Sequence, residues 1–156
     1  YVGLGSNLHD PPQQLRRALV ALAALPATRL VCQSALYGSR PFGPVSQPDF
    51  CNAAAGLLTQ LDAAALLAEL RALEEKLGRT PGGERWGPRV IDLDLLVYGS
   101  ERRSAAALTL PHPGIAERSF VLRPLCDIAP DLMVPGLGTV AALAARISMT
   151  DLWVMP

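Results

Sequence analysis

The chain has 156 residues, the usual size of one domain, and half of them are hydrophobic, which is enough for a sizeable core. Fourteen basic residues balance fourteen acidic ones, which argues against bulk binding of nucleic acid or of an anionic membrane but leaves a small basic cleft open. We therefore expect a single monomeric domain over residues 1–156, without nucleic-acid or membrane partners.

Three cysteines, Cys32, Cys51 and Cys126, are odd in number and are not spaced as metal ligands. We expect them to be reduced and mostly buried, as in a cytoplasmic protein. No apolar run reaches the length of a membrane span, and no basic segment marks a signal peptide. Because Tyr1 already falls within the first expected strand, we expect at least one further residue before it.

The first three expected elements are a strand, a helix and a strand. Residues 1–5 read as a short buried strand. Asp10 suits a helix N-cap, Pro11 suits the first helical position, and leucines then recur at helical spacing, so we predict a helix over 11–25. Residues 28–37 have the composition of a strand.

A long loop separates this strand from the next one. Residues 38–48 contain two glycines and three prolines, so they cannot continue a helix or a strand. Residues 50–59 are predicted to form a strand antiparallel to the preceding one. Asp62 then caps a helix with a leucine stripe, and Gly78 ends it.

The remaining segments complete a known pattern of elements. Residues 80–88 form a second loop rich in glycine and proline, and residues 90–98 form a strand. The region 105–135 is expected to be irregular, with short helical or extended pieces, and a last helix covers 139–147. The order predicts an α+β fold with a ferredoxin-like βαββαβ core, helices packed on a mainly antiparallel sheet, and C-terminal additions.

Two aspartates interrupt the last core strand. Alternate strand residues share a face, so Asp92 and Asp94 lie together while Ile91, Leu93 and Leu95 form an apolar face continued by Val97. Carboxylates roughly 6.5–7 Å apart repel by about 2–3 kcal/mol at an effective dielectric near 20. Surface salt bridges on a solvated strand would offset that repulsion, and so would Mg²⁺ together with arginines and phosphate.

Three other segments carry side chains suited to a ligand. His112, between two prolines, is open to a structural or a functional role. Arg118 and Phe120 share a face if their segment is extended, which would place a cation beside an aromatic ring. Phe50 and Asn52 share a strand face, offering a ring for stacking and an amide that both donates and accepts. Phe120 could equally be a core residue, and Phe50 taken alone favours a core role.

These segments together resemble the hydroxymethyldihydropterin pyrophosphokinase family of folate biosynthesis. The resemblance covers nearly the whole chain, and the order and spacing of its motifs make it specific. The motifs are YVGLGSNL, QPDFCNA, LEEKLGR, RWGPRVIDLDLL, LPHPGIAERSFVLRPL and IAPDL.

The resemblance implies transfer of pyrophosphate from ATP to the hydroxymethyl group of a dihydropterin, with release of AMP. It implies that Asp92 and Asp94 hold two Mg²⁺ ions on the phosphates, and that Arg79 and Arg89 act at the reaction centre. By the same resemblance, the pterin contacts are Ser39, Phe42, Phe50, Asn52 and Phe120. The nucleotide contacts are Glu74, Trp86, Arg89, Leu95, Thr109, His112 and Arg118.

The chain departs from the family pattern at a few positions. Pro81 stands where a second arginine is common, Ser39 and Arg40 replace a commoner Thr-Pro, and Ala107 lacks a basic side chain. Two alternatives stay open: another Mg-dependent, nucleotidyltransferase-like enzyme, and a non-catalytic ferredoxin-like ligand-binding domain. The first usually has its Gly-Ser turn and its acid pair close in sequence. The second predicts that the acids lie far from the aromatic rings.

Overall fold

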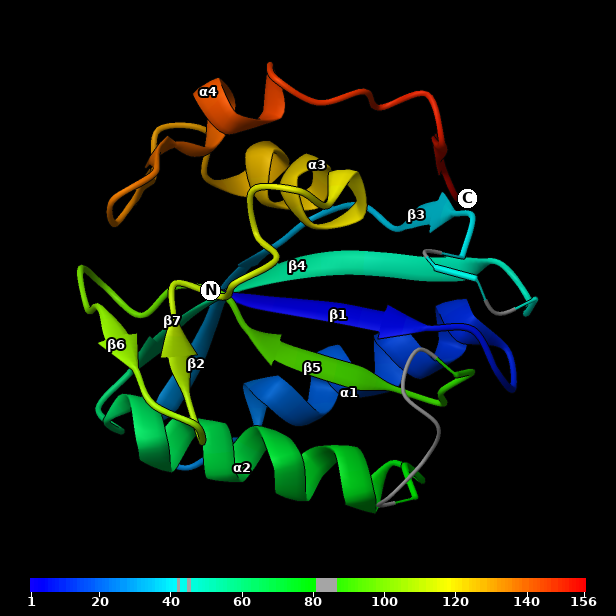
Figure 1. Cartoon of the computed structure of the whole chain (residues 1–156). Coiled ribbons are helices and arrows are strands. Elements are labelled where there is room, and N and C mark those ends of the chain that lie inside the picture. Colours follow the sequence, from blue (N-terminus) through cyan, green and yellow to red (C-terminus); the bar gives the residue numbers. More distant parts are fainter. Residues whose placement is uncertain (42, 45, 81–86) are drawn as a thin grey trace.

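The computed structural model describes residues 1–41, 43–44, 46–80 and 87–156. Its centre is a mainly antiparallel sheet with helices on both faces (Figure 1). The helices are α1 (Pro11–Ala23), α2 (Ala63–Lys76), α3 (Ser119–Ile128) and α4 (Val140–Ala144). The strands are β1 (Val2–Ser6), β2 (Thr28–Gln33), β3 (Tyr37–Ser39), β4 (Phe50–Thr59), β5 (Asp92–Leu95), β6 (Arg103–Ser104), β7 (Thr109–Leu110), β8 (Met133–Val134), β9 (Gly138–Thr139) and β10 (Leu152–Val154).

The strand order confirms the predicted ferredoxin-like core. β1 lies between β4 and β5, and it is antiparallel to both. β2 and β3 both pair with β4 on its other side, so together they take the place of the second core strand. The C-terminal addition β10 extends the sheet by pairing with β3.

The first two helices begin where their capping residues predict. The Asp10 side chain accepts a hydrogen bond from the amide of Gln13, and the Asp62 side chain accepts one from the amide of Ala65. Both helices cover the same face of the sheet, where their leucines pack against residues from β1, β4 and β5. This packing explains why the leucine spacing located both helices correctly.

Alanines allow β4 to be buried on both faces. Ala53 and Ala55 face the cluster under α1 and α2, whereas Ala54 faces the cluster beneath α3 and α4. Figure 1 places α3 directly over β4, on the opposite side of the sheet from α1 and α2. Small side chains let the helix approach the strand closely, so the low β-propensity of alanine does not prevent the strand here.

Two predicted strands are shorter than expected. The predicted strand 28–37 ends as β2 at Gln33, with a change of register between Leu30 and Cys32. β3 begins at Tyr37 and continues to Ser39, so the first two residues of the predicted loop 38–48 belong to a strand. The predicted strand 90–98 retains only β5, because Leu96 and Val97 both turn into the cluster beneath α3. Val97 was therefore assigned to the wrong face.

The C-terminal region also differs from its prediction. The segment 105–135, predicted to be irregular, contains the regular helix α3, so the residues after Arg118 are helical rather than extended. The helix predicted over 139–147 is reduced to α4. Pro124 lies inside α3, and it hides the helix from sequence rules that treat proline as a helix breaker.

All three cysteines are free thiols, with Cys51 buried and Cys32 and Cys126 half-buried. Within the described part of the chain, no helix combines the length and the apolar character that crossing a membrane requires.

Candidate active site

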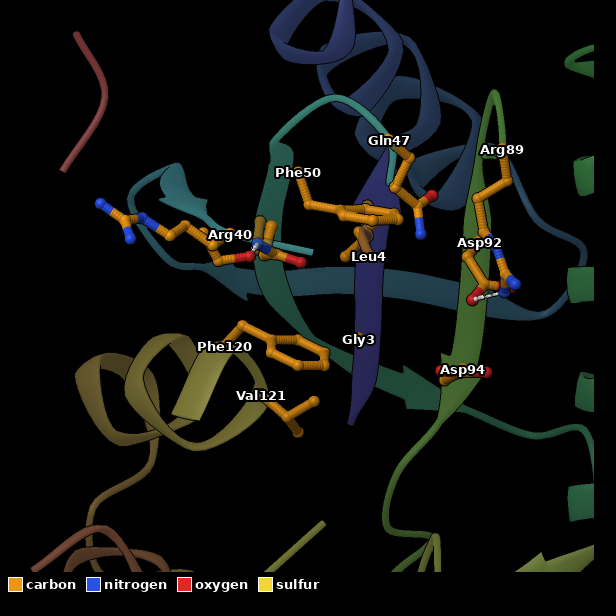
Figure 2. Close-up of a pocket in the computed structure, with 14 residues that line it drawn as sticks. Gly3, Leu4, Arg40, Gln47, Phe50, Arg89, Asp92, Asp94, Phe120 and Val121 are labelled. Carbon is orange, nitrogen blue, oxygen red and sulfur yellow. Dashed lines mark hydrogen bonds and ion pairs between the residues drawn. The ribbon is translucent and has the colours of Figure 1, made fainter. Parts of the chain in front are cut away.

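One pocket opens on the sheet face beneath α3, and it brings together residues from five elements. Figure 2 shows its aromatic side, formed from β4 and α3, and its charged side, formed from β5. Its described lining residues come from β1, β3, β4, β5, α3 and the loops between them. They are Gly3, Leu4, Gly5, Ser39, Arg40, Gln47, Phe50, Asn52, Ala53, Arg89, Asp92, Asp94, Phe120 and Val121.

Glycines of β1 form the floor of this pocket. Gly5 pairs with Asn52 on one side and with Asp92 on the other, so the three residues form a row across three strands. A Cβ atom at Gly5 would meet only the Asn52 Oδ1 atom, at 3.6 Å, which is ordinary van der Waals contact. The surrounding protein therefore leaves room for a side chain at this position. Because glycine has no side chain, this part of the pocket floor is open to a ligand.

Two phenylalanine rings form the aromatic side. Phe50 comes from the first residue of β4 and Phe120 from the first turn of α3, and both rings are half-buried. Figure 2 shows the rings facing one another with a gap between them. The Arg118 guanidinium carbon lies 5.9 Å from the centre of the Phe120 ring. Arg118 and Phe120 are therefore adjacent, as predicted. They lie at the start of a helix, however, and not in an extended segment.

The amide of Asn52 lines the same pocket as the two rings. Asn52 is buried, and its Nδ2 atom donates to Ser39 Oγ at 2.8 Å and to the Tyr37 carbonyl at 3.3 Å. These bonds fix the plane of the amide. Asn52, Ser39, Phe50 and Phe120, all predicted pterin contacts, therefore lie together, whereas Phe42 lies outside the described residues.

Asp92 is held by both predicted arginines. Arg79 Nη1 lies 2.7 Å from Asp92 Oδ1, and Arg89 Nη1 lies 2.7 Å from Asp92 Oδ2. Both oxygens of the carboxylate thus accept charge-assisted hydrogen bonds. The arrangement offsets the repulsion between the two aspartates, as the salt-bridge interpretation predicted. It also places two guanidinium groups beside Asp92, of which that of Arg89 lines the pocket.

Asp94 has a different environment. Removal from bulk water, followed by the negative charge of Asp92, raises the pKa of Asp94 to about 6. His112 Nε2 lies 3.8 Å from Asp94 Oδ2, and His112 Nδ1 accepts a hydrogen bond from the Gly114 amide. Burial lowers the pKa of His112, so the ring is neutral at pH 7 with its proton on Nε2. His112 therefore borders the carboxylate pair, although it does not line the pocket.

Glu74 connects α2 to the strand that carries the aspartates. Its Oε1 atom accepts a hydrogen bond from the Leu93 amide at 2.6 Å and forms an ion pair with Arg79 Nη1 at 2.5 Å. Burial raises the pKa of Glu74 to about 7, against the opposing effects of these two partners. The Glu74 side chain is 8% exposed, and it links Arg79 to the backbone of β5.

Three other predicted nucleotide contacts lie away from the pocket lining or outside the description. Leu95 is buried in the core beneath the sheet, so only its backbone could meet a ligand. Thr109 lies in the exposed β6–β7 hairpin, where its hydroxyl donates to the Ala105 carbonyl. Trp86 lies outside the described residues.

Asn7 was not among the residues that the sequence predicted for the site. Asn7 is buried, and its Nδ2 atom donates to Gln47 Oε1 and to the Pro48 carbonyl, both at 3.0 Å. Its Oδ1 atom accepts from the Arg89 amide at 2.8 Å. One side chain therefore joins the ends of both predicted loops to β1. The only signal in the sequence was a polar residue directly after a buried strand.

Asp92 and Asp94 could act as protein ligands of a divalent cation, although both oxygens of Asp92 are bonded to Arg79 and Arg89 in this structure. Among the described residues, no group of three or more histidine, cysteine, aspartate or glutamate side chains could hold a metal ion. A pair of carboxylates suits Mg²⁺, which keeps several waters and usually takes only one or two carboxylates plus phosphate oxygens. The donor set therefore fits Mg²⁺ bound together with a polyphosphate, and not a metal held by protein alone.

Comparisons with known proteins agree on one family. The profile of the 7,8-dihydro-6-hydroxymethylpterin-pyrophosphokinase (HPPK) family matches residues 1–130. A 2-amino-4-hydroxy-6-hydroxymethyldihydropteridine pyrophosphokinase of Haemophilus influenzae is 43% identical over 148 residues, covering 95% of this chain and 92% of that protein. Its counterpart in Pseudomonas aeruginosa is 48% identical over 135 residues, covering 86% and 83%.

Solved structures agree at the level of the fold. The crystal structure of Plasmodium falciparum HPPK-DHPS with SDX-DHP superposes with a TM-score of 0.70 over 98% of this chain, at 13% identity. The match spans 46% of that longer chain.

Proposed function

Because this chain belongs to the 7,8-dihydro-6-hydroxymethylpterin-pyrophosphokinase family, we propose that it transfers pyrophosphate from ATP to 6-hydroxymethyl-7,8-dihydropterin and releases AMP. The observation that carries the proposal is one pocket with an aromatic gap on one side and an acid–arginine cluster on the other. A planar heterocycle requires the first, and a polyphosphate requires the second.

The pterin ring lies between Phe50 and Phe120. Both rings offer flat apolar faces, and stacking favours a planar bicyclic ligand. Asn52 then contacts the polar edge of the ring through its Oδ1 atom, because its Nδ2 atom already donates to Tyr37 and Ser39, and the Ser39 hydroxyl contacts the same edge. The open floor at Gly5 leads from Asn52 towards Asp92, so a pterin held at Asn52 directs its hydroxymethyl group towards the carboxylates.

The polyphosphate lies on the charged side of the pocket. Asp92 and Asp94 would hold two Mg²⁺ ions against its oxygens. Bound there, Mg²⁺ would neutralise phosphate charge and polarise the β-phosphoryl group. Arg79 and Arg89 pair with Asp92 in the structure described here, and phosphate oxygens are equally suitable partners for a guanidinium group. We infer that these arginines transfer contacts from Asp92 to the phosphates when the nucleotide binds.

The reaction needs no covalent intermediate on the protein. The substrate hydroxyl oxygen forms a bond to the β-phosphorus, the bond from that phosphorus to the α,β-bridging oxygen breaks, and AMP leaves with the hydroxyl proton released to the surroundings. The chain contributes alignment of the two substrates and stabilisation of charge by Arg79 and Arg89. Arg118 and His112 border the same space and are proposed to contact the nucleotide.

The remaining nucleotide contacts are proposed from the family resemblance. Leu95 would act through its backbone, and Thr109 and Trp86 would lie along the nucleotide. Glu74 would act by holding Arg79 and the centre of β5 in place, since its carboxylate is already bonded to both.

The two alternatives are less consistent with this site. A nucleotidyltransferase-like enzyme has its Gly-Ser turn and its acid pair close in sequence, whereas here Ser6 ends β1 and Asp92 begins β5, with α1, β2, β3, β4 and α2 between them. A non-catalytic binding domain predicts acids far from the rings. Here Asp92, Asp94, Phe50 and Phe120 line one pocket.

Product analysis tests the proposal directly. The purified protein is incubated with ATP and Mg²⁺, with and without 6-hydroxymethyl-7,8-dihydropterin, and nucleotides are separated by chromatography. We expect AMP only when the pterin is present. Formation of ADP in place of AMP would exclude pyrophosphoryl transfer, and AMP formed equally without the pterin would exclude it as the acceptor.

A further inference from the structure

A tyrosine of the sheet is bonded to the helix that carries Phe120. Tyr37 is the first residue of β3, and the residue is buried, with 4% of its surface exposed. Its hydroxyl donates a short hydrogen bond to the Asp127 carboxylate of α3 and accepts one from Arg123 Nε at 3.2 Å. We refer to Tyr37, Arg123 and Asp127 as the Tyr37 cluster.

The two charged members of the Tyr37 cluster share a helix face with Phe120. Phe120, Arg123 and Asp127 follow the i, i+3, i+7 spacing that places side chains on one stripe of a helix. Arg123 Nε and Asp127 Oδ1 lie 3.4 Å apart, and the Arg123 guanidinium carbon lies 5.8 Å from the centre of the Tyr37 ring. The stripe that presents Phe120 to the pocket is therefore the stripe that binds Tyr37.

Through strand pairing, Tyr37 is also connected to Asn52 and Phe50 on β4, which line the pocket. Tyr37 pairs with Asn52 across β3 and β4, and Ser39 pairs with Phe50 two residues later. The Asn52 amide donates to both Tyr37 O and Ser39 Oγ. The backbone of Tyr37 is therefore held by β4 and by the Asn52 amide, so the Tyr37 hydroxyl offers α3 a fixed point on the sheet.

Apolar packing alone does not explain the hydroxyl group. Val121, Leu122 and Leu125 already pack α3 onto the sheet. Such contacts are non-directional, whereas a hydrogen bond to a carboxylate fixes a distance and an angle. Burial and the neighbouring Asp127 carboxylate raise the pKa of Tyr37, so its hydroxyl keeps its proton and remains a donor at neutral pH.

We propose that Tyr37 is a positioning residue that fixes α3 against β3 through Asp127 and Arg123, and so sets the width of the gap between Phe50 and Phe120. The proposal rests on the proposed function, because it assigns that gap to the pterin. It makes Tyr37 a determinant of pterin affinity, although Tyr37 is not among the described residues that line the pocket.

The test compares two tyrosine hydroxyls. Tyr37→Phe keeps the ring and removes the bond to α3. Tyr98→Phe is the matched control, because the Tyr98 hydroxyl also donates one short hydrogen bond, to the Leu61 carbonyl, within the cluster on the other face of the sheet. Affinities for the dihydropterin and for an ATP analogue with Mg²⁺ are measured separately by calorimetry, alongside thermal unfolding.

We expect Tyr37→Phe to weaken dihydropterin binding about tenfold, the range expected for a lost hydrogen bond to a charged group. Nucleotide affinity should stay within twofold. Asp127→Ala should reproduce the loss of pterin affinity, and it supplies an independent variant if Tyr37→Phe folds poorly. Tyr98→Phe should leave both affinities unchanged, even if it lowers the unfolding temperature.

A double-mutant cycle identifies Phe120 as the intermediary. If Tyr37 acts by placing Phe120, then Tyr37→Phe has no further effect on pterin affinity in the Phe120→Ala background. Unchanged pterin affinity in Tyr37→Phe, an equal fall in nucleotide affinity, or full additivity with Phe120→Ala would each overturn the proposal. Failure of the proposed function is distinguished beforehand, because the unmodified protein would then form no AMP with the pterin.

Discussion

Replacement of Gly5 by alanine adds one methyl group to the floor of the pocket. Gly5 lies in the row formed with Asn52 and Asp92, and its Cβ would meet no protein atom closer than Asn52 Oδ1, at 3.6 Å. Its backbone lies outside the left-handed region, so alanine introduces no backbone strain. The free energy of unfolding should therefore rise slightly, by about 0.4–1 kcal/mol, because alanine restricts the unfolded chain.

The same methyl group should oppose pterin binding. Asn52 and Asp92 lie two strands apart, about 10 Å, and a pterin held at Asn52 must cross that span to reach the carboxylates. Overpacking by one methyl group in a close-fitting site costs about 1–3 kcal/mol, which is roughly a five- to 150-fold increase in Kd. We thus expect a variant that is at least as stable as the parent but binds the pterin poorly.

Calorimetric titration with the dihydropterin measures the change in pterin affinity. Chemical denaturation of the same sample measures the change in the free energy of unfolding. Gly3→Ala is the comparison variant, because its Cβ would touch the Leu96 side chain at 3.4 Å and its strand position faces Asp94, beyond the row that contains Asn52. It should reduce pterin affinity much less. If Gly5→Ala binds the pterin as tightly as the parent, the ligand does not lie over this floor and the assigned orientation is wrong.

Three further predictions address the charged and aromatic groups. Asp94→Ala should reduce turnover far more than pterin affinity, measured by AMP release and by calorimetry, and unchanged turnover would contradict a metal-binding role. Phe120→Ala should weaken pterin binding by about 1–3 kcal/mol if the ring stacks on the ligand, and an unaltered Kd would make Phe120 a packing residue only. Because the pKa of Glu74 is raised to about 7 from 4.5, the folded state binds more protons than the unfolded state between these values, and stability should fall as pH rises through that window. Glu74→Gln should flatten this dependence in denaturation at pH 5 and pH 8, whereas Glu75→Gln, at an exposed neighbouring position, should not.

Local rules were sufficient for the parts of the fold that depend on neighbouring residues. Asp10 and Asp62 cap helices three residues from the amides that they bind, so both helix starts could be read directly. The alternation of Ile91, Leu93 and Leu95 identified the buried face of β5 for the same reason. The strand order followed once the sequence of elements was known, because few topologies accommodate βαββαβ.

The aromatic gap was predictable only as a set of candidates. Phe50 and Phe120 are seventy residues apart, and either ring could have belonged to the core. The resemblance to a family brought them together, and the pocket now contains both. The helical conformation after Arg118 could not be read, because Pro124 obscured the periodicity of α3.

By itself the sequence determined the starts of α1 and α2, the order of the core strands and the residue types available for a pterin and a polyphosphate, but not α3 or the face on which Val97 is buried. Only the tertiary structure decided how those residues are partnered. Asn7 joins two loops, Glu74 holds the amide of Leu93, and Tyr37 holds Asp127 across ninety positions of the chain. The physical reason is that a hydrogen bond depends on distance in space, and no local periodicity records which distant donor a buried acceptor will meet.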